Sequence, residues 1–133
     1  MSTQTFVAQY KTPQPADSAP VNMTRLLEMV DDDPVQLREL VAMYVKESTD
    51  AMRDLRVSVQ TGNWDQTERL AHRLGGTSAV CGMAGIVPPL RELEMTAKAG
   101  HRSFNEMLVI EASREHARVT KYFEGLGLNE VAQ

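Results

Sequence analysis

The fold of this chain is decided by the stretch from Asp33 to Gly62, which has the sequence DPVQLRELVAMYVKESTDAMRDLRVSVQTG. Asp33 and Pro34 are typical of a helix start, because an aspartate side chain caps free backbone N–H groups and a proline in the first turn loses no hydrogen bond. Gly62 is typical of a helix end. The apolar residues between them recur at spacings of three and four: Leu37, Leu40, Val41, Tyr44, Val45, Met52, Leu55 and Val59. One long helix to about Gln60 is therefore predicted, buried along a single face.

Further helices are predicted on both sides of this one. The first is expected at 23–30, with Asn22 as its N-cap, and the next runs from 63 to about 81, with Asn63 and Gln66 as a capping box. Another starts between 84 and 88 and ends at Gly100. The last is expected at 103–125, with Ser103 and Glu106 as a capping box. Short connections between long amphipathic helices make neighbours antiparallel. The predicted fold class is all-α: an antiparallel up-down-up-down four-helix bundle with a short N-terminal accessory helix.

The chain has 133 residues, the size of a single domain with one hydrophobic core. Residues 1–20 are rich in Ser, Thr, Gln and Pro, so they bury little apolar surface and are expected to form a flexible N-terminal tail. The bundle is predicted over residues 21–126, and residues 127–133 are predicted to be a C-terminal tail.

The composition argues against several classes of protein. A formal net charge of -4 gives no general attraction to nucleic acid or to an anionic membrane surface. No apolar run approaches the roughly 20 residues that a membrane-spanning helix needs, and the first residues lack the features of a secretory signal. Cys81 is the single cysteine, so no internal disulfide can form. We therefore expect a cytoplasmic protein that binds neither nucleic acid nor membrane.

His72 is the residue with the clearest chemical potential. The apolar side of its predicted helix is formed by Leu70, Leu74, Thr77, Ser78 and Cys81. At roughly 100° per residue, His72 lies about 170° from their mean direction and is expected to face solvent or a partner. An exposed imidazole is largely uncharged near neutral pH, and its attack on phosphorus would give phosphohistidine. Arg69 and Arg73 lie close enough to offset the charge of the attached group.

The surroundings of His72 on the helix are nearly bare. Its neighbours there are Glu68, Arg69, Gly75, Gly76 and Ala79. Two glycines inside a helix cost about 1 kcal/mol each relative to alanine, which suggests that the bare surface has a use. We interpret Glu68, Gly75, Gly76 and Ala79 as the face that a partner's active site approaches. The alternative is that the glycines end the helix early or allow close packing against a neighbour.

A wider pattern agrees with this interpretation. The sequence AHRLGGTSA at 71–79, followed by Gly82 and by LRELE at 90–94, resembles the histidine-containing phosphotransfer (HPt) domains of multistep two-component signalling. The likeness includes the Asp33-Pro34 helix start and the Gly62-Asn63-Trp64 turn, and it covers about residues 22–125.

The resemblance implies a phosphoryl carrier rather than an enzyme with its own nucleotide site. His72 would accept a phosphoryl group from a receiver-domain aspartyl phosphate and pass it to another receiver domain. Glu94 would hydrogen-bond and orient the imidazole, and Gly76 would clear the partner's approach. The implied partners are response-regulator receiver domains and a hybrid sensor kinase, the protein would act as a monomer, and the magnesium ion would belong to the receiver.

Two features depart from the family pattern: a position close to the histidine, and the Pro88-Pro89 pair, which is unusual where a helix is expected to be under way. Three residues after the histidine the family usually has a lysine that supports the phosphoryl group, and this chain has Gly75. This departure predicts one of three outcomes: slower transfer, a less persistent phosphohistidine, or substitution of the lysine by Arg69, one turn before His72.

Two rival functions follow from the sequence. The first is a helical adaptor that binds a receiver or kinase domain and is never phosphorylated. The second is a metal-dependent enzyme that uses His72, His101 and His116. These histidines lie on three different segments without the three- or four-residue spacing of helical metal ligands, so we expect no metal site and no cofactor.

Overall fold

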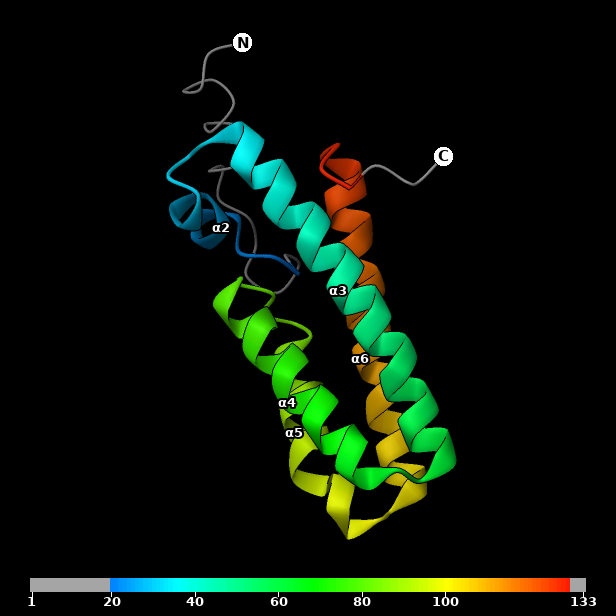
Figure 1. Ribbon diagram of the computed structural model, residues 1–133. Coiled ribbons are helices and arrows are strands. Elements are labelled where there is room, and N and C mark those ends of the chain that lie inside the picture. The colour runs from blue at the N-terminus through cyan, green and yellow to red at the C-terminus, as the bar shows by residue number, and fades with distance from the viewer. Residues whose placement is uncertain (1–19, 130–133) are drawn as a thin grey trace.

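The computed structural model describes residues 20–129, and within that range the protein is entirely helical, without a strand (Figure 1). The helices are α2 (Met23–Met29), α3 (Pro34–Thr61), α4 (Trp64–Val80), α5 (Val87–Thr96), the short 3₁₀ helix η1 (Ala97–Ala99) and α6 (Arg102–Gly125). The predicted all-α fold class is confirmed. The predicted N-terminal tail lies almost wholly outside the described residues, as does the end of the C-terminal tail.

The long helices run in alternating directions along the bundle (Figure 1). Helix α4 packs against α3 and α5, and α6 packs against the same two helices. Helix α2 lies across one end, where the N–H of Asn22 donates to the carbonyl of Gly82 at 2.8 Å. Arg25 donates from Nε to the carbonyl of Val80 at 3.1 Å and so caps the C-terminal end of α4. The accessory helix therefore closes the bundle beside the end of the His72 helix.

Local capping chemistry explains most of the helix ends. The Asp33 carboxylate accepts from the N–H groups of Val35 and Gln36. Gly62 ends α3 at φ 72°, a left-handed conformation that glycine adopts without strain. Asn63 then accepts from the N–H of Gln66 at 3.3 Å and begins α4.

The prediction for the start of α6 was wrong. Ser103 and Glu106 do not form a capping box, because the helix begins at Arg102 with His101 in the N-cap position and without a side-chain cap. Arg102 donates from Nη1 to the carbonyls of Val59 and Gln60, at 2.8 and 2.7 Å. These bonds tie the first turn of α6 to the last turn of α3.

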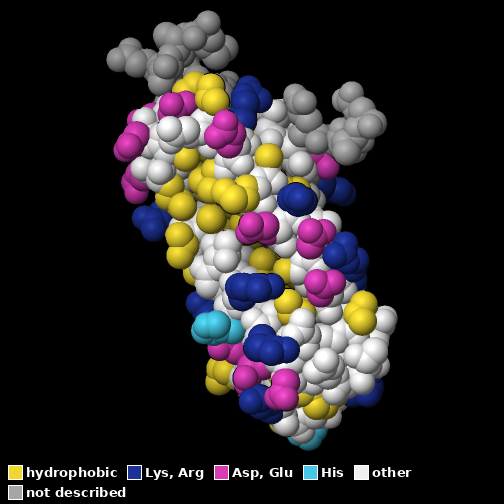
Figure 2. All heavy atoms as spheres, in the orientation of Figure 1, with side chains coloured by type: hydrophobic (Ala, Val, Ile, Leu, Met, Phe, Trp, Pro, Cys, Tyr) yellow, Lys and Arg dark blue, Asp and Glu magenta, His cyan; other side chains and the backbone are white. Residues whose placement is uncertain are grey.

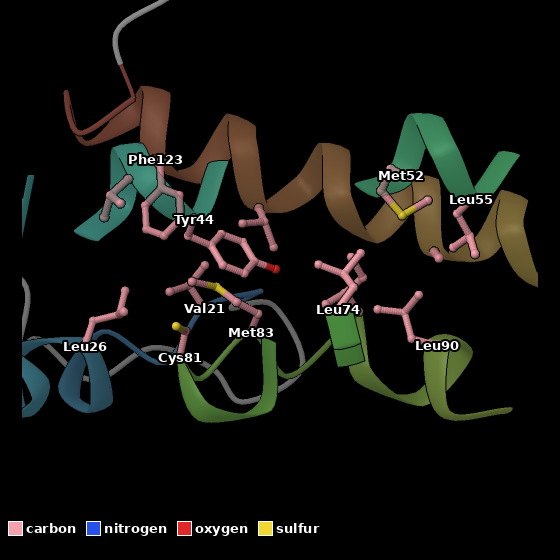
Figure 3. Close-up of a cluster of buried hydrophobic side chains, with 14 of the residues drawn as sticks. Val21, Leu26, Tyr44, Met52, Leu55, Leu74, Cys81, Met83, Leu90 and Phe123 are labelled. Carbon is pink, nitrogen blue, oxygen red and sulfur yellow. The ribbon is translucent and has the colours of Figure 1, made fainter. Parts of the chain in front are cut away.

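The apolar faces of the helices form one core (Figure 3). Tyr44 of α3 and Phe123 of α6 project toward Val21 and Met83. Tyr44 and Ser78 share a buried hydrogen bond of 2.7 Å, and burial raises the pKa of Tyr44 to about 12. The core also extends beyond the predicted end of the bundle, since Leu128 is buried. The described part of the chain contains no helix that is both long enough and apolar enough to span a membrane.

Candidate functional site

His72 lies midway along α4 on the side that faces away from the core. Leu70, Ala71 and Leu74 around it are buried and hold the helix against the bundle. The His72 side chain is 69% exposed. The helical phase predicted this orientation, and it leaves an imidazole on a rigid support with open access to one edge of the ring.

Glu94 fixes the orientation of that ring. It projects from α5, the helix that packs beside α4, and its Oε2 lies 2.7 Å from His72 Nδ1. An ionised carboxylate can only accept a hydrogen bond, so Nδ1 is the donor, and in the neutral ring Nε2 keeps a free lone pair. The sequence-predicted pair of His72 and Glu94 is thus brought together, with Nε2 on the other edge of the ring.

The two glycines after His72 occupy different environments. A Cβ added at Gly76 would meet no atom within 4 Å, so this position is open. Gly75 is buried and faces α5, where a Cβ would lie 3.6 Å from Cβ of Leu90. The prediction that placed both glycines on the approach face therefore does not hold for Gly75, because its position on the helix points toward a neighbouring helix. Ala79 is exposed on the open side.

Of the other charged residues predicted around His72, Glu68 and Arg69 have partners of their own. Glu68 lies 3.4 Å from Lys98 Nζ, and hydrogen bonding to Glu68 raises the pKa of Lys98. Arg69 donates to Gln66 Oε1 at 2.5 Å. Arg73 lines a groove of about 390 Å³ between α3 and α4. Within residues 20–129, neither arginine forms a hydrogen bond or an ion pair with His72 or Glu94.

Sequence reasoning missed Arg91, one turn before Glu94 on α5. Its Nη1 lies 3.4 Å from Glu94 Oε1, so one carboxylate contacts both Arg91 and His72. A signal existed in the sequence, since Arg91 and Glu94 have the three-residue spacing of a helical ion pair. The sequence alone did not show that α5 packs on α4, which brings this ion pair beside His72.

The remaining histidines lie elsewhere. His101 is exposed before α6, whereas the half-buried His116 on α6 lies 2.8 Å from Ser48 Oγ. Burial, assisted by the charge of Arg56, lowers the pKa of His116. Residues 20–129 contain no cluster of three or more His, Cys, Asp or Glu side chains able to hold a metal ion.

The chain is similar to a known family of domains. Residues 39–120, which include His72, Arg91 and Glu94, match the Hpt domain family. The chain belongs to the Hpt domain family. Among solved structures, the crystal structure of histidine-containing phosphotransfer protein B (HptB) from Pseudomonas aeruginosa PAO1 is similar in fold, with a TM-score of 0.76, 21% sequence identity and coverage of 86% of this chain and 99% of that one. No curated protein sequence matches the chain.

Membership of this family settles the broad class of function. Hpt domains are phosphoryl carriers of histidine phosphotransfer in phosphorelays, and they interact with response-regulator receiver domains. The surface of this Hpt domain combines apolar and charged regions: Figure 2 shows hydrophobic side chains gathered toward the α2 end, with charged side chains spread along the rest of the face. Met29 of α2, Met43 of α3 and Val80 of α4 are among the exposed apolar residues.

Proposed function

We propose that this Hpt domain accepts a phosphoryl group on His72 from a receiver-domain aspartyl phosphate and transfers it to another receiver domain. The observation that carries the proposal is the 2.7 Å bond between His72 Nδ1 and Glu94 on an otherwise exposed ring. That bond leaves the second ring nitrogen, Nε2, as a fixed and accessible nucleophile.

The chemistry needs few groups from this chain. The Nε2 lone pair attacks phosphorus, the bond from phosphorus to the aspartyl oxygen breaks, and the aspartate leaves as a carboxylate. The ring keeps its Nδ1 proton and becomes positively charged, which the Glu94 carboxylate offsets at close range. Transfer onward reverses these bonds and regenerates the neutral imidazole. The receiver supplies the magnesium ion that neutralises the phosphoryl oxygens.

The open side of α4 is the proposed approach path. Gly76 leaves space one turn after His72, and Ala79 is exposed about two turns after it. Glu68 borders the same side and is held in place by Lys98. A receiver needs close access because phosphorus must come within about 3–3.5 Å of the attacking nitrogen.

Arg69 and Arg73 remain proposed as positive charges that support the phosphoryl group. We further propose that a hybrid sensor kinase is the upstream source of phosphate, and that the protein acts as a monomer in the cytoplasm.

A phosphotransfer screen tests the proposal directly. The full chain is incubated with magnesium and receiver domains from the same genome that have been charged with acetyl phosphate. We expect acid-labile, base-stable label on the wild type and none on His72→Gln. Binding of a receiver without labelling of the wild type would support the adaptor function instead.

Glu94→Gln tests the orienting bond. The amide oxygen can still accept from Nδ1, but the negative charge is lost. Two charges 2.7 Å apart interact by about 1.5 kcal/mol even at the dielectric constant of water, so phosphorylation should slow by about tenfold. Glu92→Gln, which removes an exposed carboxylate from the same helix, is the matched control and should leave the rate unchanged. Equal rates for the wild type and Glu94→Gln would contradict the proposed role.

A further inference from the structure

Arg91 of α5 lies beside Gly75 of α4. A Cβ built at Gly75 would lie 3.7 Å from both Cζ and Nη1 of Arg91. A side chain longer than that of alanine at position 75 would therefore extend toward this guanidinium. Position 75 is one helical turn beyond His72 on the adjacent side of α4.

The same guanidinium is connected to the imidazole through a single carboxylate. Glu94 contacts Arg91 through Oε1 at 3.4 Å and His72 through Oε2 at 2.7 Å. The Arg91 side chain is 43% exposed, which leaves it room to extend toward solvent. A guanidinium has five N–H donors in a planar fork, so the contact with Glu94 leaves donors that can bind phosphoryl oxygens.

The other nearby cations are directed elsewhere. Lys98 lies beside Glu68 and Asp65, and Arg69 donates to Gln66. Arg73 faces the groove between α3 and α4, which is also lined by the carboxylates of Glu47, Asp50 and Asp54. Among these four cations, Arg91 is the one that forms an ion pair with Glu94, the hydrogen-bond partner of the imidazole.

We propose that Arg91 is the residue that binds the phosphoryl group carried on His72. The inference rests on the proposed phosphorylation of His72 and deepens it. When the phosphoryl group is attached at Nε2, Arg91 neutralises part of its negative charge while Glu94 offsets the positive ring. The supporting cation therefore comes from the neighbouring helix, and not from the helix that carries the histidine.

The test uses the full chain labelled with phosphoramidate, a small donor that needs no receiver. After removal of the donor, the half-life of phospho-His72 is followed by ³¹P NMR. We expect Arg91→Gln to shorten the half-life by about three- to fivefold, the effect of one exposed charge pair, and Arg91→Lys to retain most of it. High salt should reduce the difference between the wild type and Arg91→Gln. Arg38→Gln removes a positive charge that is held by the carbonyl of Gly127, remote in the bundle, and should leave the half-life unchanged.

A sharper test removes the positive charge of Arg91 and adds one at position 75. In the Arg91→Gln background, the space beside Gly75 is free of the guanidinium, so Gly75→Lys should restore the half-life. Gly75→Met adds similar length without charge and should not restore it. A structural role for Arg91 would predict no difference between these two double variants.

The possible failures are distinguishable. No label on the wild type by either phosphoramidate or charged receivers, with the fold intact by circular dichroism, would refute the proposed function. Normal labelling with an unchanged half-life in Arg91→Gln, or a larger loss in Arg69→Gln or Arg73→Gln, would overturn the role of Arg91 alone.

Discussion

Replacing Gly76 by leucine should make the protein more stable and yet block its transfer reaction. Gly76 lies inside α4, and a Cβ there would meet nothing within 4 Å, so a larger side chain fits without displacing a neighbour. Leucine is favoured over glycine in a helix by about 0.8 kcal/mol. The melting temperature should therefore rise by about 3–5 °C.

The rate of phosphotransfer should fall only when the donor is a protein that must reach His72. A leucine at position 76 extends into the proposed approach path one turn from the imidazole. Displacing phosphorus from the attacking nitrogen by about 1 Å can slow a transfer by about a hundredfold. Phosphoramidate is small and should still label His72 within about twofold of the wild-type rate.

The assay compares three measurements on the same preparations: thermal unfolding, labelling by phosphoramidate and labelling by a charged receiver domain. Gly125→Leu is the control, since Gly125 also has open space around it and ends α6, away from the His72 helix. It should leave both labelling rates unchanged. Transfer from the receiver that stays within about threefold of wild type in Gly76→Leu would refute the proposed approach path.

Three further predictions concern the scaffold. Tyr44→Phe leaves the buried Ser78 hydroxyl without its 2.7 Å partner and should lower the unfolding free energy by about 1 kcal/mol in urea titrations. Arg102→Met removes the bonds to the last carbonyls of α3 and should cost about 1 kcal/mol in the same titrations, while a loss confined to phosphotransfer would contradict that role. Burial, assisted by the charge of Arg56, lowers the pKa of His116 in the folded state. The unfolded state therefore binds a proton more readily than the folded state as the pH falls below 6.5, the ordinary pKa of histidine. The free energy of unfolding is unaffected by this group above pH 6.5 and decreases below it. The melting temperature of His116→Gln should therefore fall less between pH 7 and pH 5 than that of the wild type, and parallel curves would show that His116 is not responsible.

Short-range chemistry made much of this fold predictable from sequence. Asp33 with Pro34, Gly62 and Asn63 each act on backbone groups within three residues, so the helix ends they determine do not depend on distant packing. The three-and-four spacing of apolar residues likewise determines which face of α4 is buried. The outward direction of His72 follows from the same periodicity, since a helix turns by a constant angle per residue.

Only the tertiary structure decided which residues of the neighbouring helices surround His72. Gly75 and Gly76 are adjacent in sequence, but one faces α5 and the other faces open space, and no local rule states where α5 will lie. Arg91 meets Gly75 across two helices for the same reason. The start of α6 and the burial of Leu128 also depend on contacts between segments distant in sequence. The sequence by itself determined the helices and the exposed histidine, because both depend on neighbours along the chain. The charged residues around that histidine were brought together by packing, because they come from different helices.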